Sequence, residues 1–517
     1  MEGQGASESN KSLEKRKEFI KQKINSFLKD KYNLLFLGVF IFAILIRFYY
    51  FFITTTQPLW WDELVYGSLA KNFISNAWSG TPLISHELII RPFFFSFIWS
   101  LLLRIGISEI GVRFLLELIP SILSVFFVYL IGKETFGKRA GIFSAFVFSV
   151  LWIHLFYTAR LLTNVPALLF LFSSVYFFIK STKSNFNFRL FSISLFLLSI
   201  STLIRYPNGI IFLAYLFILI IGKSFLIKKI KFWYSGIIGI SPLLLFFLYN
   251  KITFGNIFPA ILGADYISVG SGATTAKAPL AFHILSFIPV YLKTIFLAFF
   301  ILGLIILLFE LLAGYNLITK NKKLKNYLLI LSILVAIYSF FIFYMRGADD
   351  RWLFATSLPL SCLVGFGTDT AYKFIKKYSS YLAILVIFGL FLMAAHSQIS
   401  HADNLIKEKK QSYLQMRQAF EWIKSNSPEG SVIVGGGIEP YSIYYADRTY
   451  LQIPSNESES YKISEANYLV VHSFVPQVGY INKYLQENQD KWQIVNAFFF
   501  DQEQKQPAVI IYRKILG

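Results

Sequence analysis

Long hydrophobic runs separated by short polar segments dominate the chain from about residue 33 to residue 396. Most runs are about 17 to 23 residues long, enough for a helix rising 1.5 Å per residue to cross a hydrocarbon core of about 30 Å. The pattern therefore predicts eleven membrane-spanning helices, over residues 33–54, 112–132, 139–157, 164–180, 188–204, 206–222, 232–249, 290–312, 326–344, 352–371 and 379–396.

The remainder of the chain has the mixed polar and hydrophobic pattern of a water-soluble domain. Helical periodicity predicts an amphipathic helix over Leu405–Lys424. Short runs rich in β-branched and aromatic residues predict strands, at Ser431–Gly437, Tyr468–Val471, Ile494–Phe500 and Ala508–Tyr512. The glycines at 435–437 do not form a GxGxxG nucleotide fingerprint and favour a tight strand-to-helix turn. We expect residues 398–517 to form a small external α/β domain.

Charge gives the expected orientation of the helices. The chain has 49 Lys and Arg against 29 Asp and Glu, a net charge of +20, whereas residues 398–517 hold 12 basic and 13 acidic residues. The excess lies in short clusters between hydrophobic runs, which argues for membrane topology and against a nucleic-acid partner. With a cytoplasmic basic arm over 1–32, alternation places five basic clusters inside, at 133–139, 180–189, 223–231, 320–325 and 373–377. We predict a multi-pass cell (plasma) membrane protein, N-terminus inside and C-terminus outside.

The first external loop, residues 55–111, contains an ambiguous hydrophobic stretch over Arg91–Ile107. It is short for a span and carries Arg91 and Arg104 near its ends. Counting it as a span would move all five basic clusters to the outside. We therefore predict an interfacial helix within the loop.

Two adjacent carboxylates, Asp62 and Glu63, follow paired tryptophans just outside the first span, in the sequence WWDELVY. Carboxylates are costly near lipid, so their presence calls for a role. Asp62 could cap a helix running through Ala70, or it could act as a base in an active site. Both roles can hold, with one carboxylate oriented by the helix end and its neighbour reactive.

Several arginines lie at the external ends of the predicted spans, against the positive-inside bias. Guanidinium groups hold phosphate through paired hydrogen bonds, so together these residues suit an anionic phosphate on a membrane lipid. The candidates are Arg160, Arg205, Arg346 and Arg351, with Lys277 as a weaker one. The histidines show no metal-ligand spacing, the single Cys362 offers no Cys-type metal site, and no P-loop indicates an ATP-driven pump.

The chain resembles the GT-C fold membrane glycosyltransferases of the protein O-mannosyltransferase and aminoarabinose-transferase superfamily, family 39-like. The similar motifs run in order through about residues 35–370: WWDELVY, RPFFFSFIWSLLLRIGISEIGVRFLLELIPSIL, YLIGKETFGKRAGIFSAFVFSV, TARLLTNVPALLF and DDRWLFATSLPL. The resemblance implies an α-helical polytopic GT-C domain over 33–397 that transfers a sugar, with inversion, from a polyprenyl- or dolichyl-phosphate donor to an acceptor hydroxyl on the external face.

The resemblance also implies residue roles. Asp62 would be the general base and Glu63 its orienting neighbour. The leaving phosphate would be held by arginines, with Arg160, Arg205 and Arg351 as first candidates and Arg346 and Lys277 as further ones. Loop and acceptor-site candidates are Tyr66, Arg91 and Asn164. Asn164 stands where many relatives carry an acidic residue, which weakens the case for a carboxylate-bound metal; a divalent metal, if any, would use Asp62 and Glu63.

Two other functions remain alternatives to the transferase. A lipid or sugar transporter or flippase would carry charged or helix-breaking residues at mid-membrane depth, where we expect none. A polysaccharide ligase of another GT-C branch would lack the Asp–Glu pair after the first span. The acceptor of a transferase could be a protein, a lipid or a glycan.

Overall fold

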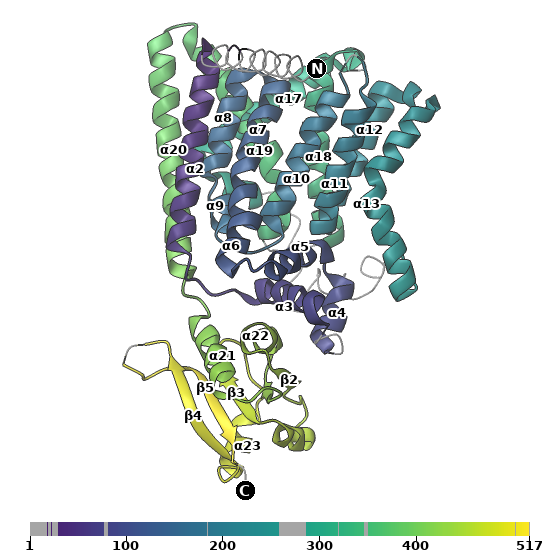
Figure 1. The fold of residues 1–517 in the computed structure, drawn as a ribbon. Coiled ribbons are helices and arrows are strands. Elements are labelled where there is room, and N and C mark those ends of the chain that lie inside the picture. Colours follow the sequence, from purple (N-terminus) through teal and green to yellow (C-terminus); the bar gives the residue numbers. More distant parts are fainter. Residues whose placement is uncertain are drawn as a thin grey trace, which may run out of the picture.

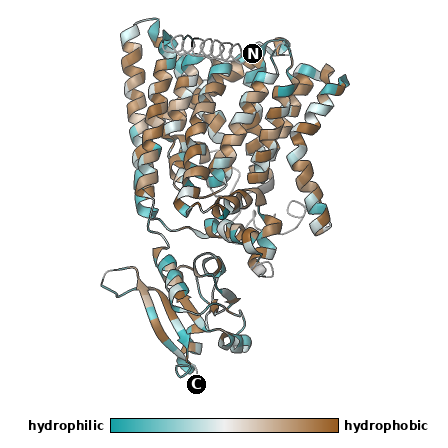
Figure 2. Cartoon of the chain, in the orientation of Figure 1, coloured by the Kyte–Doolittle hydropathy of each residue, from teal (hydrophilic) through white to brown (hydrophobic). Residues whose placement is uncertain are grey.

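The computed structural model describes residues 29–76, 81–183, 185–257, 286–318, 320–345, 350–501 and 503–515, together with residues 18 and 22. Lys277 and Arg346 lie outside the described residues. A large helical bundle is followed by a smaller sheet domain at one end (Figure 1). Hydrophobic residues cover the bundle along its length, and the sheet domain is more polar (Figure 2).

Within the described residues, eight helices are long and hydrophobic enough to cross a membrane, and two bent helix pairs meet the same test. All eleven predicted spans coincide with helical segments. These segments are α2 (Lys31–Ile53), α6 (Glu109–Arg113) with the π-helical η1 (Phe114–Leu118) and α7 (Ile119–Phe136), the bent pair α8 (Lys138–Val150) and α9 (Trp152–Thr158), α10 (Asn164–Ser181), α11 (Phe188–Ile204), η2 (Tyr206–Ile210) with α12 (Ile211–Lys223) and η3 (Ser224–Lys228), α13 (Ile230–Phe254), α17 (Phe287–Ala313), α18 (Lys322–Phe340) with η5 (Phe341–Met345), η6 (Asp350–Thr356) with α19 (Ser357–Lys376), and α20 (Ser380–Lys409).

Helices α17 and α19 pack closely where two glycines face the neighbouring backbone. A Cβ atom at Gly367 would lie 2.0 Å from the Phe299 carbonyl oxygen, and one at Gly303 would lie 2.2 Å from the Leu363 carbonyl oxygen. Small residues allow such contact between membrane helices, where lipid supplies no hydrophobic drive for association. Any side chain at either position would push the two helices apart.

A charged side chain that the sequence analysis did not single out is buried within the bundle. Arg47 of α2 is fully buried and donates hydrogen bonds to the Ser121 hydroxyl (2.7 Å), the Ser149 carbonyl (3.1 Å) and the His154 Nδ1 atom (3.1 Å). The sequence pattern did not single out Arg47 because the run around it is hydrophobic on average. Buried charge requires such partners, and these come from α7, α8 and α9. The network joins four helices, α2, α7, α8 and α9, inside the bundle.

Three short helices lie across the end of the bundle that faces the sheet domain: α3 (Trp61–Ser75), α4 (Pro82–Ile90) and α5 (Phe93–Arg104) (Figure 1). The helix predicted over residues 91–107 corresponds to α5, and the chain bends by 120° between α4 and α5 just before it. The bend falls at Arg91-Pro92, because proline disfavours helical geometry in the residue before it, and Arg91 is extended (φ −90°, ψ 147°).

The predicted helix over Leu405–Lys424 is in fact two helices. Helix α20 continues to Lys409, and α21 (Leu414–Asn426) begins after a break in which Tyr413 adopts left-handed geometry (φ 66°). A five-stranded sheet follows, in the order β2-β1-β3-β5-β4, with β1–β2 and β1–β3 parallel and the other pairs antiparallel. Its strands are β1 (Val432–Gly435), β2 (Thr449–Gln452), β3 (Tyr468–His472), β4 (Trp492–Phe499) and β5 (Pro507–Lys514).

Strand β2 was not predicted; it has four residues and pairs along one side only. The predicted tight turn after β1 is confirmed, with Gly437 at φ 67°. This turn leads into α22 (Glu439–Tyr441) and the π-helical η7 (Ser442–Ala446). A later 3-10 helix, η8 (Glu457–Glu465), and helix α23 (Ile481–Glu487) complete the domain.

The sheet domain packs onto α3 through α22 and η7. The Leu59 backbone N–H donates to the Tyr445 hydroxyl (3.0 Å), and Lys71 donates to the Tyr444 carbonyl (2.6 Å) and pairs with Asp447 (3.0 Å). The Tyr444 ring lies so close to Gly67 that a Cβ there would come within 2.6 Å of it. Helix α3 is therefore held between the bundle and the sheet domain.

Candidate functional site

A cavity of about 220 Å³ opens where α3, α4, the start of α10, η2 and η6 meet. Three arginine and two acidic side chains line it, together with aromatic rings. Its lining comprises Asp62, Tyr66, Glu87, Ile90, Arg91, Pro92, Leu162, Thr163, Asn164, Arg205, Tyr206, Pro207, Phe341, Arg351 and Trp352. The arginines outnumber the carboxylates, so the lining favours an anionic group.

Asp62 lies between two of these arginines. Its Oδ1 atom accepts from Arg91 Nη2 (2.9 Å), and its Oδ2 atom accepts from Arg351 Nη1 (2.5 Å). Burial raises the pKa of Asp62, but the charges and hydrogen bonds of Arg91 and Arg351 outweigh that effect and hold the pKa well below its usual range. Asp62 is therefore ionised at neutral pH. Its basicity depends on whether Arg91 and Arg351 donate to it or to another group.

The other polar groups of the cavity are held in place by one another. Arg91 also pairs with Glu87, and its guanidinium lies 5.0 Å from the centre of the Tyr66 ring. Arg205 donates to the Asn164 side-chain oxygen (2.9 Å) and to the Arg351 carbonyl (3.0 Å). Asn164 and the Arg351 carbonyl thus orient the guanidinium of Arg205, a group that can hold an anion through paired hydrogen bonds.

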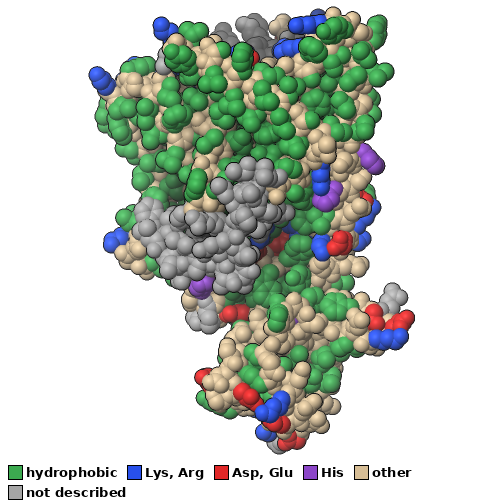
Figure 3. Space-filling view, turned by 180° about the vertical axis from the view of Figure 1, so that it is seen from behind, with side chains coloured by type: hydrophobic (Ala, Val, Ile, Leu, Met, Phe, Trp, Pro, Cys, Tyr) green, Lys and Arg blue, Asp and Glu red, His purple; other side chains and the backbone are tan. Residues whose placement is uncertain are grey.

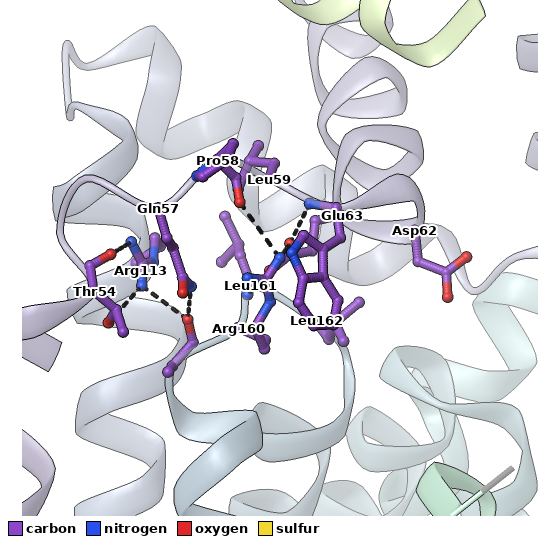
Figure 4. A network of polar contacts seen from close by, with 12 residues as sticks. Thr54, Gln57, Pro58, Leu59, Asp62, Glu63, Arg113, Arg160, Leu161 and Leu162 are labelled. Carbon is purple, nitrogen blue, oxygen red and sulfur yellow. Dashed lines mark hydrogen bonds and ion pairs between the residues drawn. The ribbon is translucent and has the colours of Figure 1, made fainter. Parts of the chain in front are cut away.

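Glu63 and Arg160 form a separate buried network (Figure 4). Each is about 1% exposed, and the Glu63 carboxylate accepts hydrogen bonds from Arg160, from the Leu161 backbone N–H and from the Trp60 backbone N–H. The Arg160 guanidinium lies 3.6 Å from the centre of the Trp60 ring. Glu63, rather than Asp62, accepts at the start of α3, and the pair ties that helix end to the loop before α10.

The loop over residues 159–162 is bound from further sides as well. Arg113 donates to the Ala159 carbonyl (2.8 Å) and the Thr54 carbonyl (2.7 Å), and the Leu162 N–H donates to Glu117 (3.0 Å). Sequence reasoning missed Arg113 and Glu117, although ionisable residues inside a predicted span are a recognisable sign of function or of internal pairing. These contacts fix the loop that carries Leu162 and Asn164 to the cavity.

A second cavity, of about 410 Å³, is also lined by Asp62. It shares Asp62, Leu162 and Arg351 with the first cavity. The rest of its lining is aromatic: Trp60, Trp61, Tyr157 and Tyr413. The carboxylate of Asp62 therefore belongs to the boundary between a cationic cavity and an aromatic one.

Asp62 and Glu63 do not fit a divalent metal as they lie. Both oxygens of Asp62 are bound by arginine, and Figure 4 shows its side chain pointing away from the Glu63 network. No group of three or more His, Cys, Asp and Glu side chains in the described part of the chain could hold a metal ion.

Comparison with known proteins bears on this geometry. Residues 90–249 match the family model described as dolichyl-phosphate-mannose-protein mannosyltransferase. No curated protein sequence matches the chain. The archaeal oligosaccharyltransferase AglB from Archaeoglobus fulgidus, solved with an inhibitory peptide and a dolichol-phosphate, is similar in structure, with a TM-score of 0.59 and 14% identity over 84% of this chain and 69% of that chain.

ArnT from Cupriavidus metallidurans bound to undecaprenyl phosphate matches with a TM-score of 0.58 and 10% identity, over 92% of this chain and 98% of that chain. Its apo state matches with a TM-score of 0.60 over the same shares. The chain has the GT-C fold. Residues 90–249 match the mannosyltransferase family model, and the fold is shared with the two membrane proteins AglB and ArnT. The resemblance inferred from the sequence motifs is confirmed for the fold and for this family match.

The GT-C fold brings together most, but not all, of the residues singled out in the sequence. Six predicted site residues line the first cavity: Asp62, Tyr66, Arg91, Asn164, Arg205 and Arg351. Glu63 and Arg160 pair with each other, and neither lines that cavity. Glu87, Tyr206 and Trp352 line it without having been predicted. Glu87 lies in the last turn of α4 and Arg91 caps that helix end, so their four-residue spacing was a usable sign of the ion pair.

Proposed function

We propose that the protein transfers a sugar, with inversion, from a polyprenyl- or dolichyl-phosphate donor to an acceptor hydroxyl. The observation that supports this most is the ionised Asp62, held by two arginines at the junction of two cavities, within the GT-C fold. AglB and ArnT were solved with dolichol-phosphate and undecaprenyl phosphate, which supports a lipid phosphate as the leaving group here. Dolichyl-phosphate mannose, named by the matching family model, is the first donor to test.

In this proposal the first cavity receives the donor phosphate. An inverting displacement places the attacking hydroxyl and the leaving phosphate on opposite sides of the anomeric carbon, so the base and the main phosphate ligand must be different groups. Arg205, oriented by Asn164, serves as the main phosphate ligand. Arg351, which lines both cavities, assists it.

Asp62 acts as the general base in the same proposal. With two arginines on its oxygens it is a weak base, and a base is most effective when its pKa lies nearer the working pH. A phosphate that draws Arg351 toward itself weakens one of these ion pairs and raises the pKa of Asp62. Donor binding would thus activate the base, and an empty enzyme would stay inactive.

Replacing Arg205 with alanine should weaken the binding of undecaprenyl phosphate by about 1.5–3 kcal/mol, or roughly 10- to 150-fold, the range for a hydrogen bond to a charged group. Arg205→Lys should recover only part of the affinity, because a point charge cannot reproduce the bidentate fork. Binding to purified protein in lipid nanodiscs measures both. Arg189→Ala, an exposed residue at the start of α11, is the control. Equal affinity of Arg205→Ala and Arg189→Ala would place the phosphate elsewhere.

We also propose that the site faces the outside of the cell membrane. The loops that carry the five basic clusters lie at the end of the bundle opposite the sheet domain, and Figure 3 shows lysine and arginine side chains gathered at that upper end. Positive residues favour the cytoplasmic side. The end with Asp62 and the sheet domain would then be external.

Cysteine labelling tests this orientation. Tyr461 in the sheet domain and Lys322 at the start of α18 are both exposed, and the native Cys362 is buried, so background reaction should be low. A membrane-impermeant maleimide should label Tyr461→Cys in intact cells and reach Lys322→Cys only after lysis. The reverse pattern would invert the proposed topology.

A further inference from the structure

We propose that the aromatic cavity is the acceptor site and that it binds a sugar ring, so that the acceptor hydroxyl belongs to a carbohydrate. This inference rests on the proposed function, because it places the acceptor next to the base. A cavity of about 410 Å³ is within the range of about 300–1,000 Å³ typical of small-molecule sites.

The chemistry of the lining carries the inference. A pyranose ring has C–H faces and a rim of hydroxyl groups. The four aromatic rings of Trp60, Trp61, Tyr157 and Tyr413 offer flat hydrophobic surfaces for the faces. Asp62 and Arg351 stand together at one end of the same lining, where they can accept from and donate to hydroxyl groups. A sugar stacked in this cavity would present one hydroxyl to Asp62.

The aromatic rings come from distant parts of the chain, and three of them pack against neighbouring side chains. Trp60 is backed by the Arg160 guanidinium, and Trp61 packs edge-on against Tyr441 (5.7 Å). Tyr413 lies in the break between α20 and α21 and packs on Phe474 (ring centres 5.0 Å apart). Its left-handed backbone is unfavourable for a bulky residue, and such geometry persists where the surroundings impose it. The sheet domain thereby contributes one wall of the acceptor site.

The lining fits a peptide acceptor less well. An extended peptide exposes an amide N–H and a carbonyl at each residue, and recognition usually pairs these groups with a strand edge or with polar side chains. The cavity instead presents four aromatic rings, Leu162 and one ion pair. A peptide hydroxyl could reach Asp62 only at the cost of leaving backbone groups unpaired.

Saturation-transfer NMR on the full-length protein in lipid nanodiscs tests the inference without requiring the natural acceptor. The probes are the methyl glycosides of mannose, glucose, galactose and N-acetylglucosamine, and a short peptide containing serine and threonine. Glucoside detergents must be absent, because they would compete. We expect at least one glycoside to receive saturation at its ring C–H protons. Tyr413→Ala should weaken that binding by about 3- to 10-fold, and Tyr413→Phe, which keeps the ring, should retain it.

Tyr461→Ala, an exposed tyrosine of the same domain, is the matched control and should bind like the wild type. Binding of the peptide in place of every glycoside, with the same dependence on Tyr413, overturns the carbohydrate assignment. Glycoside binding that Tyr413→Ala leaves unchanged also overturns it. Undecaprenyl phosphate binding is measured on the same samples. If it depends on Arg205 while no glycoside binds, the acceptor inference fails and the transferase proposal stands; if it does not depend on Arg205, the proposed donor site fails.

Discussion

Asp62→Asn should lower sugar transfer by about 10²- to 10⁴-fold, the usual contribution of a positioned general base. Its affinity for undecaprenyl phosphate should be unchanged or higher, because the substitution removes a negative charge beside Arg91 and Arg351 while leaving both guanidinium groups in place. Turnover of dolichyl-phosphate mannose, or of the native donor once identified, measures the first effect. A binding titration with undecaprenyl phosphate measures the second.

Glu87→Gln is the matched control for Asp62→Asn. Glu87 lines the same cavity and also pairs with Arg91, so it shares the electrostatic surroundings of Asp62 but not its position between the two cavities. We expect a much smaller loss of turnover. Retention of more than about a tenth of the wild-type rate in Asp62→Asn, or an equal loss in Glu87→Gln, would show that Asp62 is not the base.

Arg160→Ala should destabilise the protein strongly. Its affinity for phosphate should stay unchanged, because the arginines of the cavity bind the phosphate. Removing one partner of a buried ion pair leaves the other charge uncompensated, at a cost of about 3–5 kcal/mol. Glu63 would keep its two backbone N–H partners, but its carboxylate would remain buried without a cation. Thermal unfolding in detergent should show a clear fall in Tm. Lys407→Ala, which removes an exposed ion pair with Asp403, should show little change.

A double-mutant cycle separates this ion pair from simple loss of packing. Arg160→Met with Glu63→Gln removes both charges and keeps a side-chain oxygen for the Trp60 and Leu161 N–H groups. The double variant should be more stable than the sum of the two single effects predicts. Additive effects, or an Arg160→Ala variant as stable as Lys407→Ala, would mean that Glu63 does not depend on Arg160.

The positions of the helices could be predicted because hydrophobic runs and basic loops record the membrane directly. The same topology places Asp62, Arg205 and Arg351 at one end of the bundle, which is why these residues could be grouped from sequence and do line one cavity. The partition between Asp62 and Glu63 could not be predicted. Consecutive residues on a helix point about 100° apart, so one carboxylate faces the cavity while its neighbour turns into the protein.

The partner of Arg160 could not be predicted either. An arginine at the end of a span can face an external ligand or an internal carboxylate, and only the packing of α3 against the 159–162 loop decides between them. The role of Tyr413 was harder still to predict, because more than 250 residues of chain separate it from Trp61 and Tyr157, which line the same cavity. The position of Tyr413 depends on how α20 connects the sheet domain to the end of the bundle.

The packing of η7 on α3 has a consequence for how this protein can be re-engineered. Tyr444 fills the space over Gly67, and Lys71 is bound to the segment that ends at Asp447. A hybrid that grafts a relative's sheet domain onto this bundle would bring a foreign surface against the helix carrying Asp62. The natural unit for transplantation is therefore discontinuous: the segment that contains α3 to α5 and the C-terminal domain must be transferred together, although some three hundred residues of bundle separate them in the sequence.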